Sequence, residues 1–441
     1  MFAKIKDWLF NNKTLSQTVA KNAFWLFASK AVSGLLRAGL VIYAARILGA
    51  ASWGAFSYAL GIATFLTVFS DIGINGLITK EASRNPELKE RYLSTAFFIK
   101  ISAVFVFILA AIAFFPQLTN IQEAAKIMPI LIFVFAFDTL RDLGSALSRA
   151  LEKMQIESLI NIFTNAAIVI LGFIFLTFAR TSQSLAFAYA TGSGLGLIAI
   201  TYTLRAHFRN IFKRFNKSLV KTILVTAWPF GLMGLMGTIM LNTDIIMLGW
   251  LRSPEEIGYY SAAQKIVQAL YILPTLLASS IFPIMARLAK QNPLMAKAVL
   301  EKAVALMILI ALPVALGGIL LAAPIIKILF GLQYAPAIAT FRILMGTILI
   351  VYPSILITNA IFAHDHQKSF LVFVAAAAIG NIIFNFLLIP PFGIEGAAVS
   401  TIVTQFIANG LVWLKMRKIN GFRVLPQFKK IGNSILGSRV P

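Results

Sequence analysis

The chain of 441 residues has no cysteine, only three histidines and few charged residues, which make up 12% of the sequence. The absence of cysteine excludes disulfide bonds and thiolate metal sites. The sequence also lacks the G-x-x-x-x-G-K-[ST] motif of nucleotide-driven pumps and the H-E-x-x-H motif of zinc enzymes. Soluble domains usually carry about 25% charged residues, so this composition argues against a soluble protein. We predict neither a catalytic site nor a metal site.

Long apolar segments dominate the sequence. Hydrophobic residues make up 59% of the chain, and its mean hydropathy is +0.85. A membrane-spanning helix needs about 20 mostly apolar residues. The segments that meet this requirement are 22–48, 53–79, 92–115, 125–150, 155–178, 184–207, 219–250, 256–286, 298–322, 336–363, 367–389 and 394–416. We therefore predict an all-α polytopic membrane protein with about twelve transmembrane helices.

Basic residues outnumber acidic residues by 39 to 16, which gives a net charge of +23. Most of these basic residues lie in the segment 1–21, in alternate short loops between predicted spans, and in the basic tail 419–441. This asymmetry is the positive-inside pattern, so we expect both termini to be cytoplasmic and the segment 1–21 to be cytoplasmic or interfacial. The same distribution argues against nucleic acid as a partner.

The sequence repeats itself once. Gly54 and Ser57 of the stretch "ARILGAASWGAFSYA" match Gly258 and Ser261 of "LGWLRSPEEIGYYSAA" at an offset of 204 residues. Each half contains six predicted spans, an even number, so the two halves share one orientation. We predict two six-helix lobes, residues 22–210 and 219–418, joined by a cytoplasmic linker at 211–218 and related by a parallel pseudo-two-fold repeat.

Ionisable residues within the predicted spans are the strongest functional signal. They are Lys30, Arg37, Asp71, Lys100, Asp138, Arg141, Asp142, Asp244, Lys265 and Arg342. A charge facing lipid at the membrane centre costs about 2.5–3.5 kcal/mol, so these side chains must face protein or a water-filled cavity. The exceptions we expect are Lys100 and Arg342, which lie near span ends and snorkel to the headgroups.

Bases outnumber acids among these residues, which favours an anionic substrate such as a phosphate or pyrophosphate. We predict a substrate-binding cavity from a set of basic and polar residues: Lys30, Arg37, Arg141, Lys265 and Gln268. The acids balance those charges or couple transport to H⁺ or Na⁺, and both roles stay open for Asp71, Asp138, Asp142 and Asp244. The alternative is that these acids form structural ion pairs, Asp138 with Arg141 and Asp71 with a basic residue of a neighbouring helix. No other cofactor is expected.

Arg46 stands in the first half of the repeated junction. It follows Arg37 by nine residues, which places it about half a turn out of phase on a helix. The equivalent position of the second copy is Ile246, so the fold itself requires no charge there. We predict that Arg46 is an outer-surface anchor or gate residue. The junction glycines are expected to let the helices reverse tightly, and Ser57 and Ser261 to begin matched polar stripes that run into the cavity.

Three segments carry a resemblance to a known family. With "ARILGAASWGAFSYA", "FSDIGINGLITKEASR" and "LLIPPFGIEGAAVST", the chain resembles the polysaccharide-biosynthesis flippases of the multidrug/oligosaccharidyl-lipid/polysaccharide exporter superfamily. The resemblance implies a V-shaped pair of lobes, alternating access, and movement of a lipid-linked oligosaccharide from the cytoplasmic to the outer leaflet of the cell membrane. It also implies a basic cavity lining, which Lys30, Arg37 and Lys265 match by position.

Two other functions stay open. One is a cation-coupled exporter of drugs or other small molecules, although many members of that branch carry an acid in the first span, where this chain has Lys30 and Arg37. The other is a membrane glycosyltransferase or polymerase, which the short outer loops argue against. We expect the partners to be a lipid-linked anionic saccharide, the bilayer, and glycosyltransferases or a polymerase of the same pathway, and we expect the protein to be a monomer.

Overall fold

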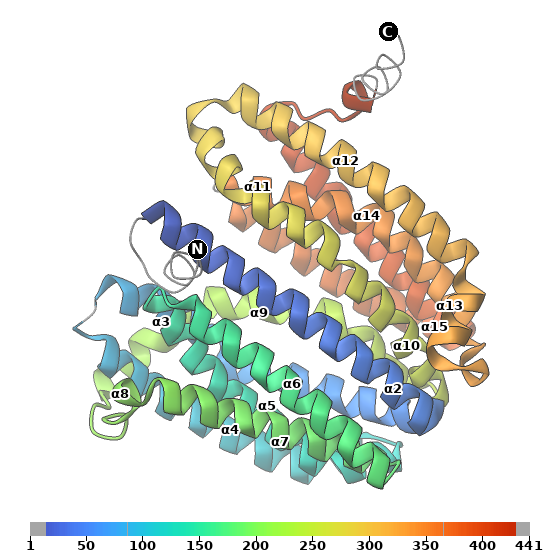
Figure 1. Cartoon of the computed structure of the whole chain (residues 1–441), viewed down its shortest axis with the longest axis horizontal. Coiled ribbons are helices and arrows are strands. Elements are labelled where there is room, and N and C mark those ends of the chain that lie inside the picture. Colours follow the sequence, from blue (N-terminus) through green and yellow to red (C-terminus); the bar gives the residue numbers. More distant parts are fainter. Residues whose placement is uncertain (1–14, 86, 365, 429–441) are drawn as a thin grey trace, which may run out of the picture. The chain divides into compact units, whose positions relative to one another are not determined.

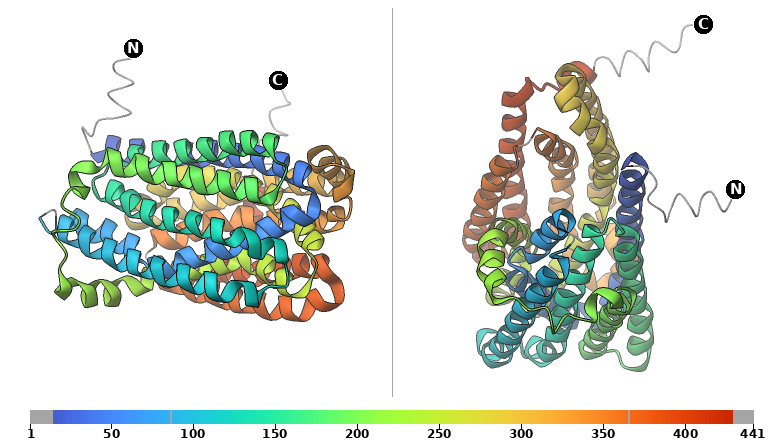
Figure 2. Two further views of the ribbon diagram at one scale, coloured as in Figure 1. Left: turned by 90° about the horizontal axis from the view of Figure 1, so that it is seen from below. Right: turned by 90° about the vertical axis from the view of Figure 1, so that its left-hand side faces the viewer.

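All secondary structure in the described part of the protein is helical. The structure is a computed structural model, and it describes residues 15–85, 87–364 and 366–428. By the density of its contacts the chain divides into two compact units, Met1–Ser261 and Ala262–Pro441. The division falls within one helix, α10 (Pro254–Leu270). Within each unit the long helices run side by side (Figure 1; Figure 2).

The first unit consists of eight helices and the start of α10. They are α2 (Leu15–Asp71), α3 (Ile74–Arg84), α4 (Lys89–Leu118), α5 (Gln122–Ala150), α6 (Met154–Phe178), α7 (Ser182–Thr203), α8 (Arg205–Phe208) and α9 (Lys217–Leu251). The helices α2, α5, α6 and α7 pack closely on one another, and α3 packs between α5 and α9. The predicted N-terminal segment 1–21 lies largely outside the described residues, and α2 is already helical from Leu15.

The second unit contains the rest of α10 and six further elements. They are α11 (Ile272–Gln291), α12 (Pro293–Leu320), α13 (Ala322–Phe330), the 3₁₀ turn η1 (Leu332–Tyr334), α14 (Ala337–Ala363) and α15 (Gln367–Asn420). The helix α14 is central, since α11, α12, α13 and α15 all pack on it. Much of the predicted basic tail 419–441 lies outside the described residues.

Two glycines break what would otherwise be single long helices. Gly49 divides α2 at φ 76°, and Gly393 divides α15 at φ 58°. Glycine adopts positive φ without the steric penalty that a Cβ imposes. Gly49 lies between the predicted spans 22–48 and 53–79, and Gly393 between 367–389 and 394–416. The reversal expected at the repeated junction is therefore made by Gly49.

One predicted span is interrupted where no break was expected. The segment 53–79 was expected to be one helix, but α2 ends at Asp71 and α3 begins at Ile74. Ile72 and Gly73 both have positive φ, 41° and 81°. Positive φ is rare for a β-branched residue such as Ile72, so the surrounding packing holds this turn in place. The interruption leaves Asp71 at a helix end.

A second interruption has a proline as its cause. The predicted span 256–286 divides at Tyr271 into α10 and α11. Pro274 has no N–H to donate to the carbonyl of Leu270, four residues earlier. The hydroxyl of Tyr352 donates to that carbonyl instead, at 2.8 Å. A buried tyrosine of α14 therefore replaces the missing backbone hydrogen bond.

Apolar helices identify the protein as a multi-pass membrane protein. Nine helical segments of the described residues are long and apolar enough to cross a membrane: 21–71, 89–117, 154–178, 182–203, 234–251, 254–282, 293–320, 337–363 and 369–420. The first and the last are about twice the length that a bilayer requires, and they contain the breaks at Gly49 and Gly393. Large apolar side chains of α4, such as Phe105 and Phe114, are well exposed, as expected of a surface that faces lipid.

Candidate functional site

A buried ion pair joins α2 to α4. The Nζ atom of Lys100 lies 2.8 Å from Oδ1 of Asp71, and the Lys100 side chain is fully buried. The same Nζ donates to the backbone carbonyl of Thr139 on α5 at 3.3 Å. The expectation that Lys100 snorkels to the headgroups is wrong, because the interruption after Asp71 brings a carboxylate within reach of the ammonium group.

Asp71 is held by the turn that follows it. Its Oδ1 accepts the backbone N–H of Asn75 in the first turn of α3, at 3.2 Å. A carboxylate that accepts such an N–H stabilises the start of a helix, both by hydrogen bonding and by its charge. Ser70, next to Asp71, contacts the hydroxyl of Thr139 at 3.0 Å. The ends of α2 and α3 are thereby tied to α5.

Arg141 is paired within its own helix. Its guanidinium lies 2.7 Å from Oδ1 of Asp138 and 3.7 Å from Oδ1 of Asp142. The structural ion pair considered for Asp138 and Arg141 is therefore present. Since two carboxylates surround this guanidinium, its charge is compensated before any substrate arrives. Arg141 was predicted to bind substrate, and that role stays a prediction.

A polar pocket lies beside these two pairs. It has a volume of about 160 Å³ and lies at the junction of α2, α3, α4, α5 and α9. The residues that line it are Thr67, Val68, Asp71, Gly73, Asn75, Lys100, Thr139, Asp142, Gly231, Gly234 and Thr238. A Cβ on Gly231 would collide with the backbone of Ile72, so this glycine allows α9 to approach the turn between α2 and α3. The pocket unites Asp71 and Asp142 with Lys100.

The basic residues of the first predicted span lie apart from this pocket. Arg37 donates from Nε to Oδ1 of Asn165 on α6, and its guanidinium lies 6.0 Å from the ring centroid of Tyr189 on α7. Its side chain nevertheless stays exposed. Lys30 is also exposed and has no ion pair among the described residues. The first half of α2 therefore presents two accessible cations, while the buried pairs lie near the end of its second half.

Asp244 has a partner that the sequence did not suggest. The hydroxyl of Tyr260 donates to its Oδ2 at 2.6 Å, and both side chains are buried. A tyrosine that stabilises a buried carboxylate has no recognisable sequence pattern, because α9 and α10 meet only in the tertiary structure.

The other predicted site residues lie elsewhere on α10 and α2. Lys265 and Gln268 lie further along α10, within the second unit, and both are partly buried. Arg46 is exposed on α2, shortly before Gly49.

The repeated junction differs from the expectation in two respects. Gly54 and Gly258 were expected to allow tight reversals, but a Cβ on Gly54 would collide with the carbonyl of Pro254, and a Cβ on Gly258 with the carbonyl of Ala50. These glycines therefore permit two helices to touch, which is the usual role of small residues in membranes. Ser57 and Ser261 are both buried, and their hydroxyls contact each other, rather than opening onto a cavity.

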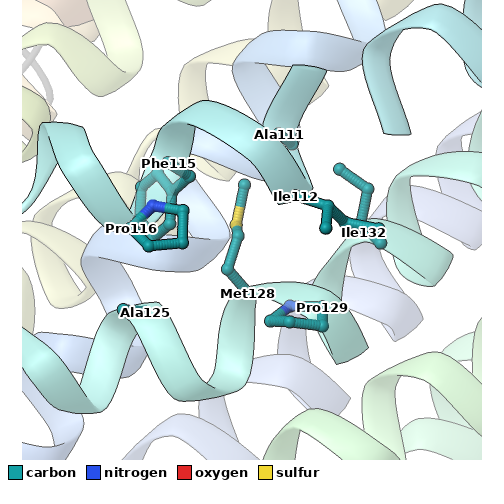
Figure 3. Close-up of a pocket in the computed structure, with 8 residues that line it drawn as sticks. All are labelled: Ala111, Ile112, Phe115, Pro116, Ala125, Met128, Pro129 and Ile132. Carbon is teal, nitrogen blue, oxygen red and sulfur yellow. The ribbon is translucent and has the colours of Figure 1, made fainter. Parts of the chain in front are cut away.

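A second pocket is small and apolar. It lies where α4 and α5 face each other, and the two prolines Pro116 and Pro129 project towards it together with Met128 (Figure 3). Its volume is about 20 Å³, roughly the room that one water molecule needs. A saccharide does not fit in such a space.

The match to a protein family decides the assignment. Residues 19–289 match the family described as "Polysaccharide biosynthesis protein". The chain belongs to this family. Its similarity to a Haloferax volcanii protein named "Probable low-salt glycan biosynthesis flippase Agl15" amounts to 22% identity and covers 87% of this chain and 80% of that protein. Similarity to the capsular polysaccharide biosynthesis protein CapF of Staphylococcus aureus is 21%, over 88% and 97% of the two chains.

Solved structures place this polysaccharide biosynthesis protein in a known fold. The lipid II flippase MurJ in an inward closed conformation superposes with a TM-score of 0.77, at 18% identity, over 93% of this chain and 91% of that chain. A multidrug resistance MATE transporter of the MOP superfamily in an inward-facing conformation superposes with a TM-score of 0.68, at 13% identity, over 97% and 99%. At these identities the likeness establishes the fold alone, which flippases and drug exporters share.

Proposed function

We propose that this polysaccharide biosynthesis protein is a flippase that moves a lipid-linked oligosaccharide from the cytoplasmic to the outer leaflet for cell-surface polysaccharide synthesis. The lipid is a polyprenyl phosphate or pyrophosphate. Membership of the family carries the proposal, and two relatives that are named as flippases support it, one by sequence and one by fold. The exposed cations Lys30 and Arg37 supply the charge that an anionic linker requires.

The transport mechanism that we propose is alternating access between the two predicted lobes, 22–210 and 219–418. In this scheme the twelve predicted spans cross the cytoplasmic membrane, with both termini on the cytoplasmic side. A parallel repeat of this kind places substrate near the middle of the membrane, between its halves. The lipid tail stays in the bilayer, so only the phosphate groups and sugars need a polar path.

The substrate site that we propose begins with Lys30 and Arg37 and is completed by Lys265 and Gln268. Arg37 suits a phosphate because its guanidinium presents a planar array of donors, and Asn165 engages only Nε. Lys30 adds a mobile ammonium group on the same stripe, seven residues earlier. Arg46, exposed beyond this stripe, is proposed as an outer gate residue.

Charge balance is the role that we propose for most of the acids. Asp71 neutralises Lys100, while Asp138 and Asp142 neutralise Arg141. An ion-coupling role for Asp244 or for the polar pocket would require that one of these carboxylates exchange its present partner for H⁺ or Na⁺. Glycosyltransferases and a polymerase of the same pathway are the partners that we propose.

Reconstitution tests the function directly. Purified protein in liposomes that contain a fluorescently labelled polyprenyl-pyrophosphate oligosaccharide should make the label accessible to an impermeant reagent, faster than empty liposomes do. The experiment is repeated with no gradient, with a proton gradient and with a sodium gradient, which separates downhill movement from coupled movement. Absence of label movement under all three conditions would exclude the flippase.

Drug export is the second candidate, and the MATE-like fold is the observation that favours it. Cells that lack the protein would then become sensitive to cationic dyes and would keep their surface polysaccharide. The flippase predicts the reverse pair of results, so the two phenotypes are measured on the same deletion strain.

A further inference from the structure

The loop between α7 and α9 is a strongly basic segment that is fixed to the protein. Residues 205–217 contain five basic residues and no acidic residue: Arg205, Arg209, Lys213, Arg214 and Lys217. Ile211 in the middle of the loop is buried, and its carbonyl accepts a hydrogen bond from the hydroxyl of Ser94 on α4. The backbone N–H of Asn216 donates to the hydroxyl of Thr95 at 3.2 Å. The loop is therefore anchored along the first turns of α4.

Aromatic rings complete this anchorage. Phe215 packs edge-on against Phe98 at 5.2 Å between ring centroids, and Phe212 packs against Phe97 at 5.7 Å. Despite these contacts Phe212 remains 71% exposed and Phe215 45% exposed. Large exposed aromatic side chains beside basic ones are typical of a segment at the boundary between headgroups and acyl chains.

A basic pocket opens at the end of this loop. Its volume is about 470 Å³, and the residues that line it are Arg91, Lys213, Arg214, Phe215, Asn216 and Lys217. Among the residues that line this pocket, only Arg214 forms an ion pair with a described residue, Glu90, at 3.1 Å. Arg91, Lys213 and Lys217 have no carboxylate partner among those residues. The pocket therefore holds three cations that no described acid compensates.

The backbone adds to this positive charge. Asn216 is the N-cap of α9, and its side chain accepts the N–H of Ser218 at 3.0 Å. The helix is 35 residues long, and the amino end of a helix carries a partial positive charge and N–H groups that favour anions. The amino end of α9 and the basic side chains of the pocket therefore favour the same kind of ligand, an anion such as a phosphate group.

We propose that this pocket binds the headgroup phosphate of an anionic membrane phospholipid in the cytoplasmic leaflet. A lipid is favoured over a free phosphate because Phe215 lines the pocket and Phe212 extends beside it, which offers apolar contact to the glycerol and the first acyl carbons. The loop lies between predicted spans on the side that the positive-inside pattern assigns to the cytoplasm, where anionic lipids attract basic segments. The inference does not rest on the proposed flippase function.

The test measures lipid binding by the purified full-length protein without any saccharide substrate. Phosphatidylglycerol and phosphatidylcholine are titrated into the detergent-solubilised protein, and retained lipid is counted by native mass spectrometry. We expect phosphatidylglycerol to bind more tightly. The triple variant Arg91→Gln, Lys213→Gln, Lys217→Gln should lose at least about tenfold in affinity for phosphatidylglycerol, because each basic residue near an anionic surface contributes to binding.

Two further variants make the comparison specific. The matched control Arg287→Gln, Lys290→Gln, Lys302→Gln removes the same number of exposed cations from the second unit, on the same predicted side of the membrane, and should keep the original affinity. Glu90→Gln releases Arg214 from its ion pair and should raise the affinity several-fold. This gain of binding cannot come from a misfolded variant.

Three results would overturn the proposal. Equal loss of affinity in the triple variant and in its control would mean that only overall charge matters. Equal binding of phosphatidylcholine and phosphatidylglycerol would remove the role of the headgroup charge. Displacement of the lipid by an equal concentration of inorganic phosphate or pyrophosphate would assign the pocket to a soluble anion.

Discussion

The hydroxyl oxygens of Ser57 and Ser261, 204 positions apart in the sequence, lie 3.2 Å from each other in a buried contact. The offset is the one that relates the two copies of the repeated junction. This contact, with Gly54 and Gly258 beside it, brings the two copies of the repeated sequence together where α2 packs against α10.

The first prediction concerns the glycines of this junction. Gly54→Ala should lower the free energy of unfolding by about 1–3 kcal/mol, because its Cβ would collide with the carbonyl of Pro254, a backbone atom that cannot rotate away. Thermal unfolding of the purified protein in detergent measures the change. Gly39→Ala is the control in the same helix, since no atom lies within 4 Å of its Cβ position. Equal stability of the two variants would contradict the close contact.

The second prediction concerns the pair of Lys100 and Asp71. Asp71→Asn should destabilise the protein by about 3–5 kcal/mol, because it leaves the fully buried ammonium of Lys100 without its carboxylate. Lys100→Met should also destabilise it. The double variant should recover most of the loss, since no buried charge remains unpaired.

A double-mutant cycle based on chemical or thermal unfolding gives the coupling between these two residues. Additive effects of the two substitutions would show that the ion pair contributes nothing to stability. Lys100→Arg is the matched control, because it keeps the charge and changes only the shape of the group.

The third prediction separates transport from stability in α2. Lys30→Gln should leave the free energy of unfolding within about 0.5 kcal/mol of the original value, because Lys30 is exposed and has no ion pair among the described residues. It should nevertheless slow the movement of a lipid-linked oligosaccharide in liposomes by about tenfold, the loss expected when one charged contact worth about 1.4 kcal/mol is removed.

The matched control for Lys30→Gln is Lys126→Gln. Lys126 is also an exposed basic residue, and it lies at the start of the predicted span 125–150, outside the proposed substrate site. It should change neither stability nor transport. Transport by Lys30→Gln at the original rate would remove Lys30 from the proposed substrate site.

The fourth prediction concerns the break between α10 and α11. Tyr352→Phe removes the hydroxyl that serves the carbonyl of Leu270 and should cost about 1–3 kcal/mol, the penalty for a buried acceptor without a donor. Pro274→Ala restores an N–H at the position that normally bonds to this carbonyl. The combination of the two substitutions should therefore be more stable than Tyr352→Phe alone. A combined loss equal to the sum of the separate losses would refute this compensation.

Much of the helical architecture followed from hydropathy. The predicted span 155–178 corresponds to α6 (Met154–Phe178), and 336–363 corresponds to α14 (Ala337–Ala363). Such agreement is expected, because a lipid environment requires each apolar segment to satisfy its own backbone hydrogen bonds as a helix. The breaks at Asp71 and Tyr271 did not follow from hydropathy, since the apolar character of the chain continues through both.

The candidate site was predictable in its residue types and only partly in its pairings, since the spacing of Asp138 and Arg141 suggested the ion pair that the structure shows. The cost of a charge in lipid identified Lys30, Arg37, Asp71 and Asp244 as residues that must face protein or water. Whether such a residue contacts a substrate or a neighbouring helix depends on which helices meet. Lys100 shows the difference, because its place near a span end suggested the headgroups, whereas the turn at Ile72 and Gly73 gave it Asp71 as a partner.

The sequence by itself determined that this is a helical membrane protein, because composition and segment length are properties of the chain alone. The tertiary structure alone decided that Ser57 meets Ser261, that Tyr260 holds Asp244, and that Asp71 neutralises Lys100. These contacts join residues of different helices. Helix packing, through small residues and interhelical hydrogen bonds, selects such contacts, and hydropathy along the chain does not encode them.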